Sequence, residues 1–269
     1  MLFPFHDDNP TVRTPVVTCA IIVINVIVFV WASRLPPLQS QVLHYQRGFV
    51  PARIAQLSNP EPIFVPIEGP DRHPFFRHPA AVRSLKLDPQ PKQILLSLLT
   101  CMFMHGSWWH LIGNMWFLWI FGNNVEDRLG PVLYLAIYLA GGLLASGSHW
   151  LADPSSPIPV IGASGAVATV LGAYAITWPW ARVHTLVFLL IFITIIDLPA
   201  LLVLGVWFVG QLLAGRQSLI AGAHGGVAWW AHVGGFVAGL LLMPLLSAAV
   251  GAPPRPKLVR QSDSNKLDY

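Results

Sequence analysis

Long runs of apolar residues with almost no charge constrain this chain more than any other feature of its sequence. Only 10% of the 269 residues are charged and 54% are hydrophobic, whereas a soluble domain carries roughly 25% charged residues. So few charged groups cannot form the polar surface of a water-soluble globule. The lipid bilayer is therefore the expected solvent for much of the chain.

Six segments are predicted to be transmembrane helices, since a helix needs about 20 mostly apolar residues to cross the hydrocarbon core. They cover roughly residues 16–33, 108–126, 131–152, 161–178, 186–213 and 228–249. The fifth is the least regular, because Asp197 and Pro199 lie inside it. These residues predict either a kink or an interfacial segment followed by a shorter span that begins near Pro199; if both halves crossed, there would be seven spans.

The remaining segments complete the predicted domain organisation. Residues 1–15 form a polar N-terminal segment, 16–249 form the six-span domain, and 250–269 form a polar tail. Within the domain, residues 34–92 are rich in Pro and Arg and show little periodicity, which predicts a long, irregular loop between the first two helices. Lys and Arg in the short connections favour the side of the N-terminus, so both termini are expected in the cytoplasm.

Composition also limits the partners. The net charge of +4 is modest, and no basic cluster with interleaved aromatic residues occurs, which argues against nucleic-acid binding. Cys19 and Cys101 both lie in apolar runs, which predicts buried thiols and no disulfide framework. The lipid bilayer is the expected partner, and the oligomeric state stays open.

A serine and a histidine inside the spans suggest a catalytic site, because polar groups at membrane depth usually face a cavity or a partner. Ser164 begins the fourth span and His232 lies in the sixth. A serine hydroxyl becomes a nucleophile when a base takes its proton, and a neutral imidazole is the usual base near pH 7. Gly165 on the fourth span, with Gly235 and Gly239 on the sixth, allows the two backbones to approach closely.

A second group of polar residues offers donors for a developing negative charge. His110 and Asn114 are four residues apart, so they lie on one face of the second span, and His105 precedes them. Their N–H groups, with backbone N–H groups at the helix start next to Ser164, form a candidate oxyanion hole. Each motif alone is also typical of helix packing. A zinc site made from His105, His110 and His232 is an alternative without a carboxylate ligand.

Together these motifs resemble those of the rhomboid family of intramembrane serine proteases. That family shows Gly-x-Ser-Gly at the start of the fourth span, His-x-x-x-Asn in the second, and a His followed by Gly at +3 and +7 in the sixth. The matching residues are Gly162, Ser164, Gly165, His110, Asn114, His232, Gly235 and Gly239. A Glu-x-Arg-x-Gly motif after the second span is matched by Glu126, Arg128 and Gly130, and the resemblance covers about 93–249.

The resemblance implies an all-α, six-helix membrane bundle that cleaves transmembrane protein substrates, with no cofactor and no metal. It implies Ser164 as nucleophile, His232 as base, and an oxyanion hole made by His110, Asn114 and the Ser164 backbone N–H. The site is expected near the outer face of a bacterial cytoplasmic membrane. Many rhomboids carry an aromatic residue where this chain has Ala168, so the orientation of His232 stays open. The alternatives are a non-catalytic rhomboid-like protein that binds membrane clients, and a small transporter or channel.

Overall fold

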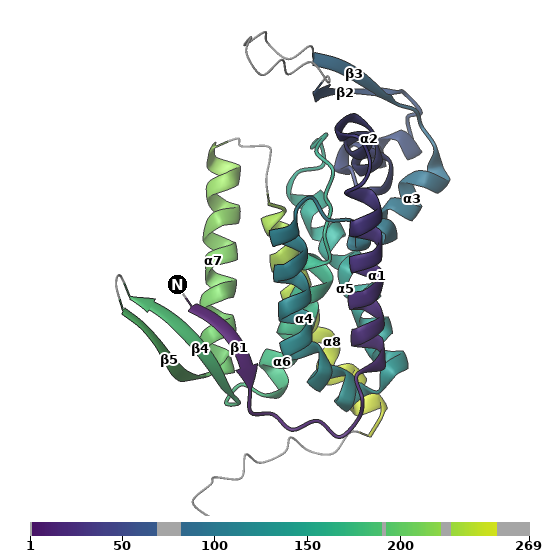
Figure 1. The fold of residues 1–269 in the computed structure, drawn as a ribbon. Coiled ribbons are helices and arrows are strands. Elements are labelled where there is room, and N and C mark those ends of the chain that lie inside the picture. Colours follow the sequence, from purple (N-terminus) through teal and green to yellow (C-terminus); the bar gives the residue numbers. More distant parts are fainter. Residues whose placement is uncertain (1, 69–81, 190–191, 222–226, 252–269) are drawn as a thin grey trace, which may run out of the picture.

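The computed structural model describes residues 2–68, 82–189, 192–221 and 227–251, which are mostly helical (Figure 1). The tail predicted for residues 250–269 lies almost entirely outside the described residues. The helices are α1 (Val16–Ala32), α2 (Pro37–Arg47), η1 (Pro51–Leu57), α3 (Pro91–Thr100), η2 (Cys101–Phe103), α4 (Trp108–Leu129), α5 (Pro131–Ala152), α6 (Ser164–Thr177), α7 (Ala200–Ala221) and α8 (Trp229–Ala249). The strands are β1 (Leu2–Asp7), β2 (Ile63–Glu68), β3 (Val82–Leu87), β4 (Arg182–Leu189) and β5 (Phe192–Pro199).

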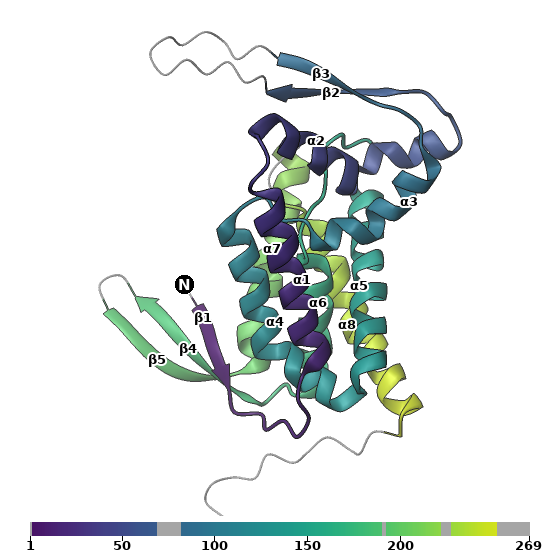
Figure 2. The ribbon, with the colours of Figure 1, turned by 45° about the vertical axis from the view of Figure 1, so that its right-hand side comes forward.

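Helices α1 and α4 to α8 lie side by side in one bundle, as Figures 1 and 2 show from two directions. Helix α6 forms the centre of the bundle, because every residue from Gly165 to Ala175 is buried. A helix that is apolar and buried on all sides is typical of a protein core. The first residue of this central helix, Ser164, lies at one end of the bundle, and the β1–β4–β5 sheet lies at the other.

The described helices are those of an integral membrane protein, but fewer than six of them are long and apolar enough to count as candidate spans. Helices α5, α7 and α8 are each long and apolar enough to cross a membrane. The α3–η2 segment and α4 pass the same test only as a pair bent by 77°. Helices α1 and α6 are apolar but shorter, with 17 and 14 residues. The described residues thus contain three or four candidate spans, and the six-span count stays a prediction.

The prediction of one helical segment over 186–213 is wrong. Strands β4 and β5 form an antiparallel hairpin, and α7 begins at Ala200, directly after Pro199. This region is rich in Val, Ile, Phe and Thr, which fit a pleated sheet better than a helix. Pro199 fixes its own φ angle and lacks an N–H, which suits the entry to a helix. The alternative of a shorter span that begins near Pro199 describes the helix correctly.

Strand β1 adds to this hairpin and gives the sheet order β1–β4–β5. The polar composition of residues 1–15 gave no indication of a strand. The end of β1 is anchored to the central helix, because the Tyr174 hydroxyl donates a hydrogen bond of 2.5 Å to the Asp7 carboxylate. The Asp7 side chain is buried, and this burial raises the pKa of its carboxyl group to about 6.

The segment 34–92 is more regular than the predicted irregular loop. It contains α2, η1 and the antiparallel β2–β3 hairpin, although residues 69–81 lie outside the described part of the chain. Backbone hydrogen bonds of 3.0 and 2.7 Å join Phe49 to Val160, just before α6. The segment therefore braces the chain that leads into the central helix.

Glycines allow α6 and α8 to approach within backbone contact. A Cβ atom on Gly235 would overlap the carbonyl oxygen of Gly165, and one on Gly239 would overlap that of Thr169. On the facing side, a Cβ on Gly172 would overlap the carbonyl oxygen of Phe236. The small residues on both helices thus have the packing role that their spacing predicts.

The contact between α6 and α8 predicts a sharp difference between two glycine substitutions. Gly239→Ala should lower the free energy of unfolding by on the order of 3 kcal/mol, because the new methyl group meets backbone that cannot move aside. Gly205→Ala in α7 is the matched control, since nothing lies within 4 Å of its Cβ position and alanine favours a helix. Thermal unfolding in detergent micelles measures both. Equal midpoints for the two variants would contradict this packing.

Candidate active site

Ser164 and His232 lie in hydrogen-bond contact at one end of the bundle. Ser164 is the first residue of α6, and His232 is in the first turn of α8. The Ser164 Oγ atom lies 2.8 Å from the Nε2 atom of His232. The imidazole is buried, whereas the serine is partly exposed. The close approach of the two helices therefore brings together a hydroxyl and a base that are far apart in the sequence.

Gln211 of α7 fixes the other side of the imidazole. Its Oε1 atom lies 2.6 Å from Nδ1 of His232. An amide oxygen only accepts hydrogen bonds, so Nδ1 carries the ring proton in this arrangement. The lone pair of Nε2 then points at the hydroxyl of Ser164, which is the tautomer that a general base needs.

Gln211 orients His232 in a chain that has Ala168 where many rhomboids have an aromatic residue. Ala168 is fully buried where α6 crosses α8, and its Cβ would lie 3.2 Å from a Cβ on Gly235. The orienting groups come from α7 instead, where Trp207 lies one turn before Gln211 with its ring centre 6.0 Å from that of His232. Gln211 was not among the residues predicted from the sequence, although a lone amide within the apolar run "VLGVWFVGQLLAG" indicates a polar partner or a cavity.

His105 holds one of the predicted oxyanion donors, Asn114. The Asn114 side-chain amide lies 3.0 Å from Nε2 of His105, and the Ala163 backbone N–H reaches the same nitrogen at 3.5 Å. Nε2 accepts both, so buried His105 links α4 to the residue before Ser164. An amide nitrogen carries two hydrogens, so Asn114 keeps one for another acceptor.

Gly162 shapes the approach to Ser164. Its φ angle of 125° is one that residues with a side chain rarely adopt. A Cβ at this position would lie 2.6 Å from Cε1 and Nε2 of His110, so only glycine lets that imidazole approach the backbone next to the serine. The position thus needs glycine both for its conformation and for the space it leaves.

A cavity of about 870 Å³ is lined by both predicted catalytic residues, Ser164 and His232, and by both predicted oxyanion donors, His110 and Asn114. Gln211 and Trp207 line it as well. A pocket of this size lies toward the upper end of the range for ligand sites in proteins, about 300–1,000 Å³. The cavity therefore has room for a short stretch of extended peptide beside the hydroxyl.

Glu126 and Arg128 lie at the other end of α4 and support the architecture. The Glu126 carboxylate accepts hydrogen bonds from the backbone N–H groups of Val17 and Thr18, both at 2.8 Å, and from the Thr18 hydroxyl at 2.7 Å. A negative charge at the start of α1 interacts favourably with the dipole of that helix. Arg128 donates a hydrogen bond of 3.3 Å to Ser247 in α8.

The zinc alternative is not supported by the described residues. His105, His110 and His232 do not bring their ring nitrogens into one group able to hold an ion, and the nitrogens of His232 contact Ser164 and Gln211.

Comparison with known proteins points to one protein family. Residues 92–249, more than half of the chain, match a family model described as a rhomboid domain. The presenilin-associated rhomboid-like protein, mitochondrial, of Rattus norvegicus is 30% identical over 43% of this chain and 31% of its own length. Rhomboid-like protein 11, chloroplastic, of Arabidopsis thaliana is 32% identical over 55% of this chain and 51% of its own. Rhomboid protein 1, mitochondrial, of Saccharomyces cerevisiae is 30% identical over 58% and 43%.

These matches cover only part of the relatives. The chain spans from about a third to a half of the length of the curated proteins named above. The region that matches the family model, residues 92–249, nevertheless includes the whole of α4 to α8. It therefore contains the serine, the histidine and the cavity that they line. With a rhomboid domain over more than half of its length, this chain belongs to the rhomboid family.

Proposed function

We propose that this protein is an intramembrane serine endopeptidase that cleaves membrane-anchored proteins in or near their transmembrane segment. The observation that carries the proposal is the 2.8 Å contact between Ser164 Oγ and His232 Nε2, with Nδ1 held by Gln211. Such an arrangement of nucleophile, base and orienting group is the general pattern for an activated serine.

The proposed reaction has two halves. The Ser164 hydroxyl attacks the carbonyl carbon of the substrate while His232 Nε2 takes its proton, and a tetrahedral intermediate forms. The imidazolium then gives this proton to the leaving amine as the C–N bond breaks, which leaves an acyl-enzyme. Water, deprotonated by the same nitrogen, attacks the ester carbon, and the imidazolium then returns the proton to the Ser164 oxygen as the acid is released. The hydrogen bond from Nδ1 to the Gln211 oxygen keeps the ring in place throughout.

The negative charge of the intermediate has three candidate donors. The backbone N–H of Ser164 belongs to the first turn of α6, where an N–H group has no carbonyl acceptor within the helix. The helix dipole also favours an anion at this end. His110 approaches beside Gly162, and Asn114 is held by His105. Donors fixed before the reaction stabilise developing charge without a cost of reorganisation.

The proposal includes a membrane topology. Helices α1 and α4 to α8 would all cross the bilayer, with both termini in the cytoplasm and the cavity near the outer face. The substrate helix would unwind at the site, because a helical peptide bond is shielded by its own hydrogen bonds. The three relatives above are named as mitochondrial or chloroplastic, and their names do not support the expectation of a bacterial cytoplasmic membrane.

The first test removes the two members of the dyad separately and together. Ser164→Ala and His232→Ala should each reduce cleavage of a membrane-anchored test substrate in proteoliposomes to background, and the double variant should be no worse, because the two residues act as one unit. Gel analysis and mass spectrometry of the fragments measure the cleavage. Wild-type cleavage by Ser164→Ala would refute the dyad. Binding without cleavage by the wild-type protein would favour the non-catalytic, client-binding alternative.

The second test concerns Gln211 as a positioning residue. Gln211→Leu removes the acceptor for Nδ1 and should lower kcat about tenfold or more with little change in KM, since a hydrogen bond of this kind is worth about 1.5 kcal/mol. Gln211→Glu keeps an oxygen acceptor and should retain more activity than Gln211→Leu. Gln217→Leu, at an exposed position of the same helix, is the matched control. An equal loss in Gln211→Leu and Gln217→Leu would contradict the orienting role.

A further inference from the structure

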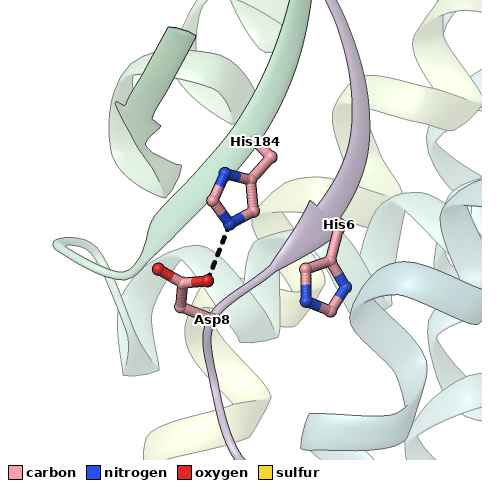
Figure 3. Close-up of side chains that lie close together, drawn as sticks. All are labelled: His6, Asp8 and His184. Carbon is pink, nitrogen blue, oxygen red and sulfur yellow. Dashed lines mark hydrogen bonds and ion pairs between the residues drawn. The ribbon is translucent and has the colours of Figure 1, made fainter. Parts of the chain in front are cut away.

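Two histidines and an aspartate lie together at the end of the bundle opposite to the cavity. Figure 3 shows His6 and Asp8 from the β1 segment beside His184 from β4. In the antiparallel register His6 lies directly opposite His184, and Asp8 lies two residues after His6 along the chain. Each residue offers one ligand atom, and these atoms all lie within 4.8 Å of one another. The fold thus gathers three metal-ligating side chains from two distant segments.

The neighbouring strand holds one of these histidines in a suitable orientation. Asp197 is the cross-strand partner of His184 in β5, and its Oδ1 atom lies 2.6 Å from Nδ1 of the imidazole. Nε2 of His184 donates a hydrogen bond of 2.7 Å to the Asp8 carboxylate (Figure 3), and a metal ion that binds there would replace this proton, which is released to water. Histidine ligands in metal sites usually donate their second N–H to a carboxylate, which fixes the ring and its tautomer. His184 already has this supporting partner.

The cluster is accessible to water, and Asp8 also forms an ion pair with an arginine. His6 and Asp8 are exposed and His184 is partly buried. The Asp8 Oδ2 atom lies 3.4 Å from Nε of Arg182, which leaves Oδ1 directed at the histidine. The rings of His6 and His184 stack with centres 5.5 Å apart and planes 4° apart. An ion can therefore reach the cluster from water.

We propose that His6, Asp8 and His184 bind a divalent late first-row transition-metal ion, with Zn²⁺ as the best match. Two imidazole nitrogens and one carboxylate oxygen are ligands that Zn²⁺ favours, whereas Mg²⁺ and Ca²⁺ favour oxygen alone. Tetrahedral ligand bonds of about 2.0–2.2 Å place donor atoms about 3.4 Å apart. Nε2 of His184 and Oδ1 of Asp8, which lie 2.7 Å apart, therefore have to separate slightly, while the His6 nitrogen moves closer to them. The bound ion would tie β1 to the β4–β5 hairpin. This site does not depend on the proposed protease activity.

The test is a Zn²⁺ titration of the whole purified protein in detergent micelles. The protein carries an affinity tag other than polyhistidine and is first treated with a chelator. Competition with a fluorescent zinc indicator measures affinity and stoichiometry, and thermal unfolding with and without Zn²⁺ measures stabilisation. The expected result is one Zn²⁺ per chain, a higher unfolding temperature with Zn²⁺, and no competition by Mg²⁺. Cobalt should give visible absorption bands typical of low coordination number.

Variants decide whether the cluster is the site. His6→Ala and His184→Ala should each weaken zinc binding at least about tenfold, and Asp197→Ala should weaken it by about 10–100-fold, because it removes the acceptor that orients His184. His44→Ala, in α2 and outside the cluster, should leave the affinity unchanged. Because His6 is exposed, its variant should unfold at the wild-type temperature without metal. Absence of binding at micromolar Zn²⁺, or equal binding by the wild-type protein and His6→Ala, would overturn the proposal.

Discussion

The backbone contact between α6 and α8 is the constraint on which the rest of the structure depends. Gly165 and Gly235 meet there without side chains between them, and Gly239 continues the contact one turn further. Because the helices touch at this distance, Ser164 at the start of one and His232 at the start of the other lie within a hydrogen bond. Any side chain inserted between the helices would separate them and break the pair.

The other elements hold this central pair in place from both ends. At the cavity end, α7 supplies Gln211 to the imidazole, and His105 links α4 to the chain just before the serine. At the opposite end, Glu126 caps α1, and Asp7 receives a hydrogen bond from Tyr174 of the central helix. Of these groups, Gln211 lines the cavity, whereas His105, Glu126 and Asp7 hold the positions of the surrounding helices.

The sequence singled out Ser164 and His232, which the structure brings into contact, but it missed several of the elements around them. Ser164 and His232 stand out because a polar residue within an apolar, small-residue helix is costly unless it has a partner. The β4–β5 hairpin was missed because a long apolar run rich in β-branched residues has no period that separates strand from helix. Strand β1 was missed because its partner lies about 180 residues away. The role of Gln211 depends on how α7 packs, which no local pattern specifies.

The most direct measurement of the central claim is covalent labelling of the purified protein with a fluorophosphonate, followed by mass spectrometry of the modified peptide. Such a reagent reacts with a serine whose hydroxyl is activated by a neighbouring base. The account predicts a single adduct, on Ser164, that is abolished in Ser164→Ala and strongly reduced in His232→Ala. An adduct on a different serine, or no adduct on folded wild-type protein, would contradict it.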